Sequence, residues 1–354
     1  MTAAPEEKPL DRPVAPVDRA SHALALERLD SLTKPLGSLG RLEALAAQLC
    51  AVQGTVSPRL SAPHALVFAG DHGVARRGVS AYPPEVTAQM VANFLEGGAA
   101  ISVLARREGF SLTVVDAGVD AHFAPDPHLI DAKVRRGTRD FGFEAAMTGA
   151  ECREALHRAE RIVLRVADSG SNTLILGEMG IGNTASASVL MHGLTGIPLP
   201  DCVGRGTGLD DAGLVRKVAL LSAACARRAP PVEPLDLLTE FGGYEIAMLV
   251  GAALAAARER MVVLVDGFTV TVAVLLASRL APALLDYCTF GHCSAERAHR
   301  ALLEIMGVRP VLDLDMRLGE GSGAAIALGV LRAALALYLD MVTFDQAGVS
   351  ERLG

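Results

Sequence analysis

The feature that most constrains the fold is a pattern that recurs along the chain, in which a short apolar run ends at a turn that contains glycine. The runs cover residues 64–69, 112–115, 173–176, 261–265 and 310–314. Continuous rather than alternating apolar runs indicate strands that are buried on both faces. Helical segments between them require right-handed crossovers. We therefore predict an α/β fold, an open and mostly parallel Rossmann-like sheet with helices on both faces.

The glycine turns have a common consequence for function. Ligands of such sheets bind beyond the carboxyl ends of the strands, so all five turns should lie along one edge. Acidic residues follow or end four of the runs: Asp71, Glu178, Asp266 and Glu320. We expect these four side chains to be neighbours despite their separation in sequence.

The segments outside the sheet predict the domain organisation. Residues 1–20 are proline-rich and charged, and are expected to be a flexible tail. Helices predicted over 21–32 and 41–52 would form a small helical domain, 21–62, completed by C-terminal residues about 342–354. Residues 63–341 would form a large α/β catalytic domain, with long helices over 84–107 and 324–341.

Composition excludes several classes of protein. The net charge of −7 and the absence of tryptophan give no electrostatic or stacking surface for nucleic acid. The N-terminus lacks an apolar signal segment, and the longest apolar run, 246–257, is too short to span a bilayer. Six cysteines without metal-ligand spacing are typical of reduced thiols. A cytoplasmic protein without membrane contact is expected.

The last glycine turn, 316–323, carries the most distinctive chemistry. Three glycines let backbone amides approach a ligand, and the following helix directs its positive end to the same point. Such a turn suits a phosphate, yet it holds the anion Glu320. A purely structural explanation is that Glu320 gains about 0.3–1 kcal/mol from the helix dipole.

A second junction, 177–184, supports two interpretations. It lacks the lysine of a P-loop and the spacing of a dinucleotide fingerprint. Either Asn183 or Thr184 simply caps the next helix, or the loop cradles a phosphate or ribose with Glu178 near the sugar hydroxyls. Gly180 and Gly182 would supply the close backbone approach.

Three further segments are weaker candidates. The loop 204–208 with Arg205 and Gly206, followed by Lys217, could wrap an anion or be a surface loop. The segment 291–296 is predicted to open a helix with Ser294 as its N-cap. Asp71, His72 and Asp116 resemble metal ligands, but no ligand spacing supports them, so no metal is expected.

Taken together, these motifs resemble the nicotinate-nucleotide–dimethylbenzimidazole phosphoribosyltransferase family. The matching stretches, in the family's order, are Lys34–Glu43, Ala69–Val74, Gly78–Pro83, Glu85–Thr87, Gly177–Thr184, Asp266–Phe268, His292–Glu296 and Met316–Ala324. The resemblance implies transfer of phosphoribose from nicotinate mononucleotide to dimethylbenzimidazole, without cofactor or metal. It also implies a homodimer with a large α/β domain and a small helical domain.

The resemblance also implies roles for individual residues. Glu320 matches the family's catalytic base. Residues implied to form the acceptor-base pocket are Ser80, Tyr82, Gln89, Met90 and Leu318. Residues expected to bind the rest of the substrates are Glu178, Gly180, Gly182, Asn183, Thr184, Arg205, Gly206, Lys217, Asp266, Gly267, Phe268, Ser294, Gly319, Gly321 and Ser322. The acceptor itself, a benzimidazole or a related base, stays open because the stretch around Tyr82 varies within the family.

The chemistry of this transfer fits a single base. The leaving pyridinium departs as a neutral ring and needs no acid, whereas the attacking azole must lose a proton, which Glu320 could accept. Two alternatives remain. One is a metal-dependent phosphoribosyltransferase that uses a diphosphate donor, although residues 114–118 lack its pair of adjacent acids. The other is a non-catalytic nucleotide sensor, which would not need Glu320.

Overall fold

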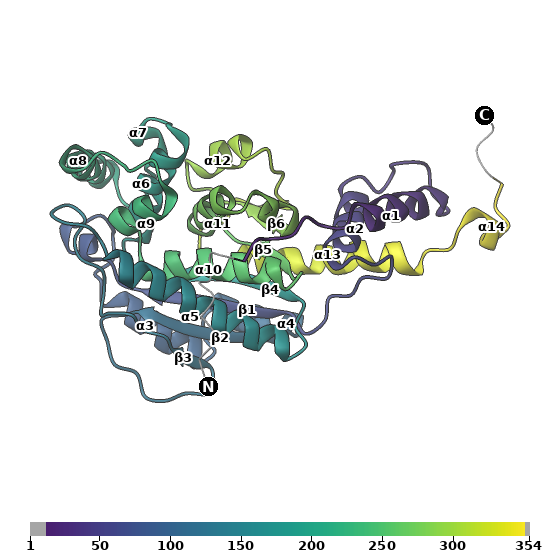
Figure 1. Ribbon diagram of the computed structural model, residues 1–354, viewed down its shortest axis with the longest axis horizontal. Coiled ribbons are helices and arrows are strands. Elements are labelled where there is room, and N and C mark those ends of the chain that lie inside the picture. Colours follow the sequence, from purple (N-terminus) through teal and green to yellow (C-terminus); the bar gives the residue numbers. More distant parts are fainter. Residues whose placement is uncertain (1–11, 351–354) are drawn as a thin grey trace, which may run out of the picture.

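The computed structural model describes residues 12–350, and its centre is a six-stranded parallel sheet in the order β3-β2-β1-β4-β5-β6 (Figure 1). The strands are β1 (His64–Gly70), β2 (Ser111–Gly118), β3 (Leu129–Asp131), β4 (Thr173–Met179), β5 (Val262–Val265) and β6 (Cys288–Phe290). Four predicted strands are confirmed as β1, β2, β4 and β5. The order reverses between β1 and β4, and ligands bind at such a switch point.

The prediction of a buried strand over 310–314 is wrong. Only Leu312 and Asp313 form a strand, β8, which pairs with β7 (His292–Cys293) in a separate two-stranded sheet. Leu314 is 54% exposed. The edge of the main sheet is taken instead by β6, and a short apolar run cannot by itself distinguish a core strand from an extended surface segment.

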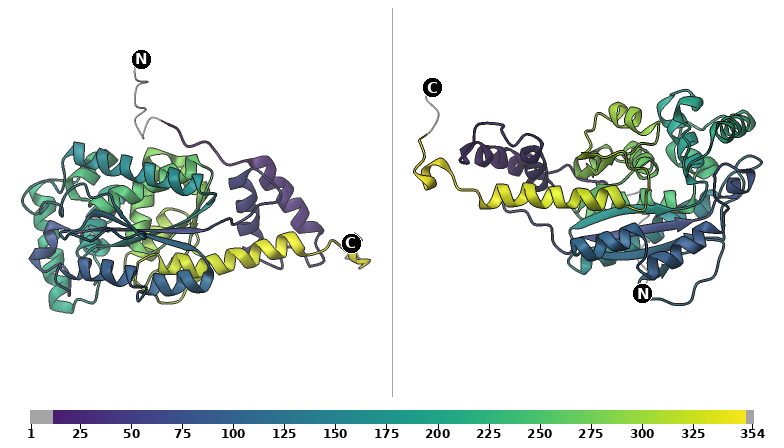
Figure 2. Two further views of the ribbon diagram at one scale, coloured as in Figure 1. Left: turned by 90° about the horizontal axis from the view of Figure 1, so that it is seen from below. Right: turned by 180° about the vertical axis from the view of Figure 1, so that it is seen from behind.

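Helices cover both faces of the sheet. On one face lie α3 (Val86–Leu95), α4 (Ala100–Glu108) and α13 (Ser322–Asp340), seen from behind in Figure 2. On the other lie α5 (Gly149–Asp168) and α10 (Tyr244–Arg258). The longest apolar run of the sequence is α10, which is buried from Tyr244 to Ala257 between α5 and the sheet.

The remaining elements of the large body are η1 (Gly73–Arg77), α6 (Asn183–Thr195), α7 (Leu199–Cys202), α8 (Asp211–Arg227), α9 (Pro234–Phe241), α11 (Phe268–Leu280), η2 (Pro282–Tyr287) and α12 (His299–Ile305). Among them, α11 contacts β4 and β5, and α6 contacts α7, α8, α9 and α11.

The single helix predicted over 84–107 is wrong, because the segment forms two helices, α3 and α4. Gly97 adopts φ +79 between them, and Arg106 Nη1 donates to the Gly97 carbonyl oxygen at 2.8 Å. By length and composition alone, Val86–Glu108 and Ser322–Asp340 could cross a membrane. Both segments instead lie along the sheet, where α13 contacts β4 and β5, and α3 contacts β1 and β2.

A small helical unit stands away from the sheet at the far end of α13 (Figures 1 and 2). It contains α1 (Arg19–Ser31) and α2 (Arg41–Gln53), and α14 (Phe344–Ala347) follows α13. Its own core is made of Ala25, Leu29, Leu32, Ala46, Ala47, Cys50 and Tyr338. Because Tyr338 belongs to α13, that helix runs through both parts of the molecule. The boundary between two domains stays a prediction.

The expected N-terminal tail lies partly outside the described residues, since these begin at residue 12. Its described part is attached to the body. Val14 is buried, and the Tyr287 hydroxyl donates to the Ala15 carbonyl oxygen at 2.9 Å. The C-terminal segment also returns to the helical unit, because Thr33 N donates to the Val342 carbonyl oxygen at 3.0 Å.

Candidate active site

A cavity lies at the carboxyl ends of β4 and β5, where the glycine turns meet. The predicted residues that line it are Glu178, Gly180, Asn183, Thr184, Gly206, Gly267, Phe268, Ser294, Leu318, Gly319 and Glu320. The lining residues that the sequence analysis missed are Met179, Ile181, Thr207, Thr269, Glu296 and Arg317. The predicted convergence of distant turns is therefore observed for the junctions after β4, after β5 and before α13.

Glu320 has an unusual backbone in this cavity. It adopts φ +66 between Gly319 (φ +86) and Gly321 (φ +88), so three consecutive residues are left-handed. For a residue with a side chain this conformation costs roughly 1–2 kcal/mol, and such outliers cluster at functional sites. Glu320 is 6% exposed, and among the described residues its Oε2 has no hydrogen-bond partner. The carboxylate is therefore held at the cavity with an acceptor atom unoccupied.

Asp266 holds the turn that carries Glu320. Its Oδ1 accepts from Gly323 N at 2.8 Å and Ala324 N at 3.1 Å, and its Oδ2 accepts from Gly321 N at 3.0 Å. These amides belong to the first turn of α13, where backbone donors lack intrahelical partners. Asp266 is fully buried and does not line the cavity. Its geometry is that of a support beneath the turn, not of a group in contact with a substrate.

The turn itself is closed by short contacts. The Ser322 hydroxyl donates to the Gly319 carbonyl oxygen at 2.7 Å. On the opposite side, a Cβ on Gly177 would lie 2.5 Å from the Glu320 carbonyl oxygen. Only glycine at 177 therefore lets β4 approach the turn this closely.

Glu178 faces the same turn from β4. Its Oε2 accepts from Asn183 Nδ2, and a Cβ on Gly319 would lie 2.7 Å from its Oε1. Burial raises the pKa of Glu178 to about 8, and the negative charges of Asp266, Glu245 and Glu320 add to this effect. The carboxyl is thus largely protonated at neutral pH.

The pKa of Glu320 is also raised, to about 7. Burial is the main cause and the charge of Asp266 contributes, while the Ile101 backbone amide acts in the opposite direction. Carboxyls that titrate near neutrality in a cavity are candidates for acid–base chemistry.

A buried cation lies behind the cavity wall, since Lys217 does not line the cavity but contacts Thr184, which does. Lys217, on α8, is 1% exposed, and its Nζ donates to Thr184 Oγ1 at 3.0 Å and to the Gly204 carbonyl oxygen at 3.1 Å. Burial lowers its pKa to about 8, so it stays mostly charged at pH 7. Nearby, Gly206 N donates to Glu296 Oε1 at 3.2 Å.

Two predicted helix caps are wrong. The N-cap of α6 is Gly182, so neither Asn183 nor Thr184 caps it, and their side chains contact Glu178 and Lys217 instead. Ser294 caps no helix, because α12 begins at His299. The Ser294 hydroxyl accepts from Glu296 N at 3.2 Å within the loop.

Some predicted site residues are not part of this cavity. Arg205 pairs with Asp211 and donates to the Leu209 carbonyl oxygen, so its guanidinium serves its own loop. The predicted acceptor-pocket residues Ser80, Tyr82, Gln89 and Met90 do not line it either. Ser80 Oγ lies 2.9 Å from Thr207 Oγ1, and Tyr82 is 53% exposed. Their roles stay predictions.

A buried contact between a histidine and a carboxylate, beneath the site, was missed by the sequence analysis. His72 Nε2 lies 2.6 Å from Glu245 Oε1, and His72 Nδ1 lies 3.0 Å from the Ser186 hydroxyl. Glu245 is on α10, 173 positions from His72. No local pattern signals this contact, because the two residues meet only when α10 packs under the sheet edge. Among the described residues, no group of three potential ligands could hold a metal ion.

Comparison with known proteins gives consistent matches over nearly the whole chain. A family model described as phosphoribosyltransferase matches residues 14–349. A relative from Cupriavidus taiwanensis, named nicotinate-nucleotide–dimethylbenzimidazole phosphoribosyltransferase, is 54% identical over 346 residues, which are 98% of each chain. A relative of the same name from Dechloromonas aromatica is 56% identical over 328 residues, 92% of this chain and 94% of that one.

Solved structures agree with the sequence matches. A crystal structure of CobT from Thermus thermophilus superposes with a TM-score of 0.91 at 44% identity, over 94% of this chain and all of that one. A second structure from the same organism, titled as the dimethylbenzimidazole phosphoribosyltransferase, gives a TM-score of 0.89 at 43% identity, over 95% of this chain and all of that one.

Proposed function

The chain belongs to the nicotinate-nucleotide–dimethylbenzimidazole phosphoribosyltransferase family, and on this premise we propose how its residues perform the transfer. Phosphoribose passes from nicotinate mononucleotide to 5,6-dimethylbenzimidazole. The products are nicotinate and α-ribazole 5′-phosphate, which serves in assembly of the cobalamin lower ligand. The predicted enzyme class is thus confirmed, and the roles of individual residues are our proposal.

The reaction requires one proton acceptor. One azole nitrogen attacks the anomeric carbon, the bond from that carbon to the pyridinium nitrogen breaks, and its electron pair stays on nicotinate. The other azole nitrogen loses its proton to Glu320. General-base help of this kind contributes roughly a hundredfold to ten-thousandfold in rate. The observation that carries the assignment is the left-handed Glu320, with its unpartnered Oε2 among the described residues, at the cavity.

The remaining carboxyls act on charge. Positive charge develops at the anomeric carbon as the pyridinium leaves, and fixed negative groups stabilise it. Asp266 and Glu245 lie behind the cavity wall, and their negative charges raise the pKa of Glu178. Glu178 itself lines the cavity and is largely protonated at neutral pH, so it can donate a hydrogen bond to a ribose hydroxyl. We assign Glu178 to the face of the ribose and Asp266 to a positioning role beneath Glu320.

The phosphate requires donors. Lys217 supplies a buried cation beside Thr184, and α6 directs the positive end of its dipole toward the cavity. Arg317, which the sequence analysis missed, also lines the cavity. It is an exposed cation that lies shortly before Glu320 in the sequence. This set can hold a phosphate without a metal ion.

We propose a homodimer in the cytoplasm. Leu318, 57% exposed at the cavity, and Tyr82, 53% exposed, leave apolar surface that a second copy or the acceptor could cover. Sedimentation velocity of the purified chain tests the dimer, and a monomer at micromolar concentration would refute it.

Nicotinate release provides the test of function. The purified chain is mixed with nicotinate mononucleotide and dimethylbenzimidazole in the presence of a chelator, and nicotinate is measured by chromatography. We expect release by the native chain and a loss of at least a hundredfold for Glu320→Gln. Release that needs a divalent metal and a phosphoribosyl diphosphate donor would favour the metal-dependent alternative. Binding of the mononucleotide without release would favour a sensor.

A further inference from the structure

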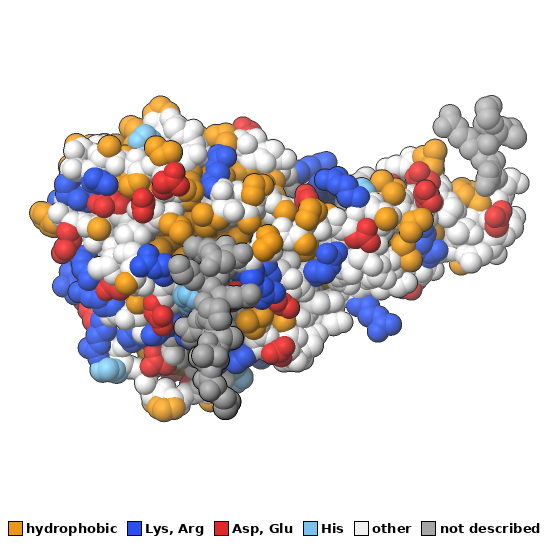
Figure 3. All heavy atoms as spheres, viewed as in Figure 1, with side chains coloured by type: hydrophobic (Ala, Val, Ile, Leu, Met, Phe, Trp, Pro, Cys, Tyr) orange, Lys and Arg blue, Asp and Glu red, His pale blue; other side chains and the backbone are white. Residues whose placement is uncertain are grey.

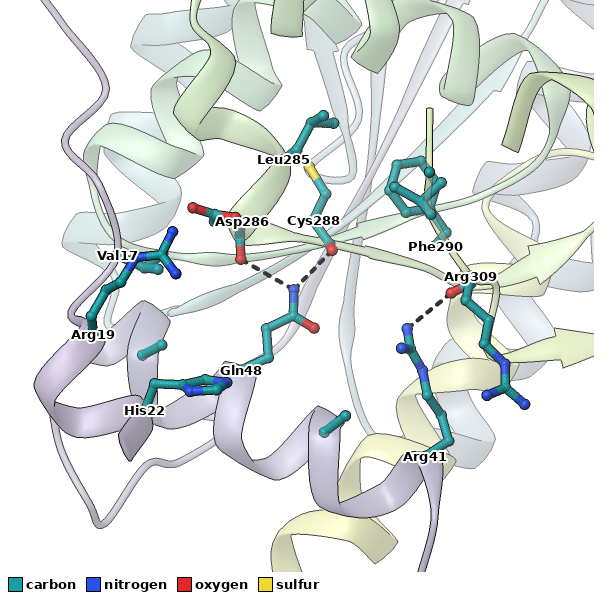
Figure 4. Close-up of a pocket in the computed structure, with 14 residues that line it drawn as sticks. Val17, Arg19, His22, Arg41, Gln48, Leu285, Asp286, Cys288, Phe290 and Arg309 are labelled. Atoms are coloured by element: carbon teal, nitrogen blue, oxygen red, sulfur yellow. Dashed lines mark hydrogen bonds between the residues drawn. The ribbon is translucent and has the colours of Figure 1, made fainter. Parts of the chain in front are cut away.

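A second cavity, of about 330 Å³, lies between the small helical unit and the large body. It shares no lining residue with the catalytic cavity. Figure 4 shows polar side chains from α1 and α2 facing the chain that leads into β6 and β8. The polar side chains that line it are Arg19, His22, Arg41, Gln48, Asp286 and Arg309.

The charged side chains that line this cavity are mostly positive. Among the described residues, Arg19, Arg41 and Arg309 form no ion pair, whereas many other arginines do. Asp286 is the one acidic residue that lines this cavity in the described part of the chain. Unpaired arginines on both sides of one cavity, with Arg19 at one side and Arg41 and Arg309 at the other (Figure 4), are unexpected in a chain whose net charge is −7. Figure 3 shows Lys and Arg side chains around this junction.

Arg41 has a side-chain nitrogen that is buried without a hydrogen-bond partner among the described residues. Its Nη2 donates to the Arg309 carbonyl oxygen at 2.9 Å (Figure 4), but its Nε is buried without a partner among the described residues. Burial lowers the pKa of Arg41, and the positive charge of Arg309 lowers it further. A buried donor without a partner is unfavourable, so an acceptor at this place would stabilise the protein.

Gln48 does not supply that acceptor, because its amide group is already hydrogen-bonded to other residues. The Gln48 amide nitrogen donates to the Asp286 carbonyl oxygen at 3.1 Å and to the Cys288 carbonyl oxygen at 2.9 Å. Its Oε1 accepts from Thr289 Oγ1 at 3.3 Å. These bonds turn Gln48 toward the large body, as Figure 4 shows, and leave the arginines unmatched.

We propose that this cavity binds a phosphate group, either as inorganic phosphate or as the phosphate of a small monoester. Guanidinium groups match the oxygens of a phosphate in paired hydrogen bonds. About 330 Å³ falls in the range of small-ligand pockets. Arg19 and Arg41 come from the helical unit, whereas Arg309 comes from the large body. A bound phosphate therefore joins the two parts and stabilises their junction.

Calorimetric titration of the full chain tests the proposal. Inorganic phosphate and ribose 5-phosphate are titrated separately at constant ionic strength, with sodium chloride as the reference. The variant is Arg19→Gln/Arg309→Gln, because neither side chain donates a hydrogen bond among the described residues. The control is Arg107→Gln/Arg161→Gln, which removes two exposed charges elsewhere.

The native chain and the control should bind phosphate at two classes of site, the second being the catalytic cavity. The Arg19/Arg309 variant should lose one class, with affinity at least tenfold weaker, while kcat and KM for nicotinate release stay unchanged. Tighter binding of ribose 5-phosphate than of phosphate identifies a monoester as the occupant, and the reverse identifies the free ion. Identical titrations for the variant and the control would overturn the proposal, whatever the outcome for catalysis.

Arg41→Gln provides a second, independent variant. It should weaken the same class of site and reduce the thermal stabilisation that phosphate gives the native chain, because a ligand raises stability according to its concentration relative to Kd. Thermal stabilisation by phosphate that is equal in Arg41→Gln and native protein would also overturn the proposal.

Discussion

Replacement of Asp266 by asparagine tests the claim that this residue positions Glu320. Asparagine has nearly the same shape but only one acceptor oxygen. The Oδ1 bonds to Gly323 N and Ala324 N, at 2.8 and 3.1 Å, can survive. The bond from Gly321 N to Oδ2, at 3.0 Å, cannot, because an amide nitrogen would face another donor.

The cost can be worked from these three bonds. A hydrogen bond to a charged acceptor contributes about 1.5–3 kcal/mol, and its neutral counterpart is roughly half as strong. Loss of one bond and weakening of two gives a decrease of about 3–6 kcal/mol in the free energy of unfolding. A base displaced by about 1 Å can lose about a hundredfold in rate, so we expect kcat to fall about 10- to 100-fold.

The pH profile separates positioning from general loss of structure. Glu320 must be deprotonated to accept a proton, so kcat/KM should rise with pH through the pKa of Glu320, about 7. The charge of Asp266 raises the pKa of both Glu320 and Glu178. Removing this charge lowers both pKa values, so the acidic limb should move to lower pH in Asp266→Asn.

Steady-state nicotinate release from pH 5 to 9 and urea unfolding provide the measurements. Asp313→Asn is the matched control, since it removes an exposed carboxylate that pairs with Arg300 on the surface. The control should keep the native rate and profile. An acidic limb in Asp266→Asn that stays in place or moves to higher pH would refute the electrostatic part of the reasoning. An unchanged kcat would refute the positioning role.

Three further substitutions give distinct outcomes. Glu320→Gly and Glu320→Gln should both lose at least a hundredfold in kcat. The glycine variant should be about 1 kcal/mol more stable than the glutamine variant, because φ +66 suits glycine. Urea midpoints that show the glycine variant to be the less stable of the two would contradict this. The folded pKa of Glu178, about 8, lies above the ordinary 4.5, so its contribution to stability is present below pH 4.5 and is lost as pH rises to about 8. Glu178→Gln should therefore stabilise the fold by about 1–3 kcal/mol more at pH 8 than at pH 5, and equal effects at both pH values would refute the raised pKa. Lys217→Met keeps a buried aliphatic side chain but removes the charge. It should raise KM for nicotinate mononucleotide at least tenfold, with little change in KM for the acceptor. An equal rise in both KM values would argue against a contact between Lys217 and the phosphate.

The sequence predicts those parts of the fold that repeat a local rule. The runs that became β1, β2, β4 and β5 were recognisable because strands of a parallel sheet are continuously apolar. The three residues of β6 were too few to stand out, and the run over 310–314 satisfied the same rule while lying at the surface. Hydrophobicity alone does not determine which of two short runs completes the edge of the sheet.

The candidate site divides in the same way. Glu320 and Glu178 could be chosen because glycines surround each of them in the sequence. Glu245 could not be chosen, because it lies within an apolar helix and reaches the site only through the packing of α10 under the sheet. Asp266 was predicted to bind substrate, and its position at a strand end does not reveal that amides of α13 surround its carboxylate. Tertiary contacts determine these roles.

The helix α13 begins at the Glu320 turn and ends in the core around Tyr338, and this fixes its phase as well as its length. One residue inserted midway would rotate everything beyond it by about 100° and advance it by about 1.5 Å. Tyr338 would then leave Ala25 and Cys50, or the turn at the other end would have to rotate to compensate. The helix can therefore accept substitutions of its side chains more readily than insertions or deletions. Any change in the number of residues within α13 changes the position of the Glu320 turn relative to Tyr338.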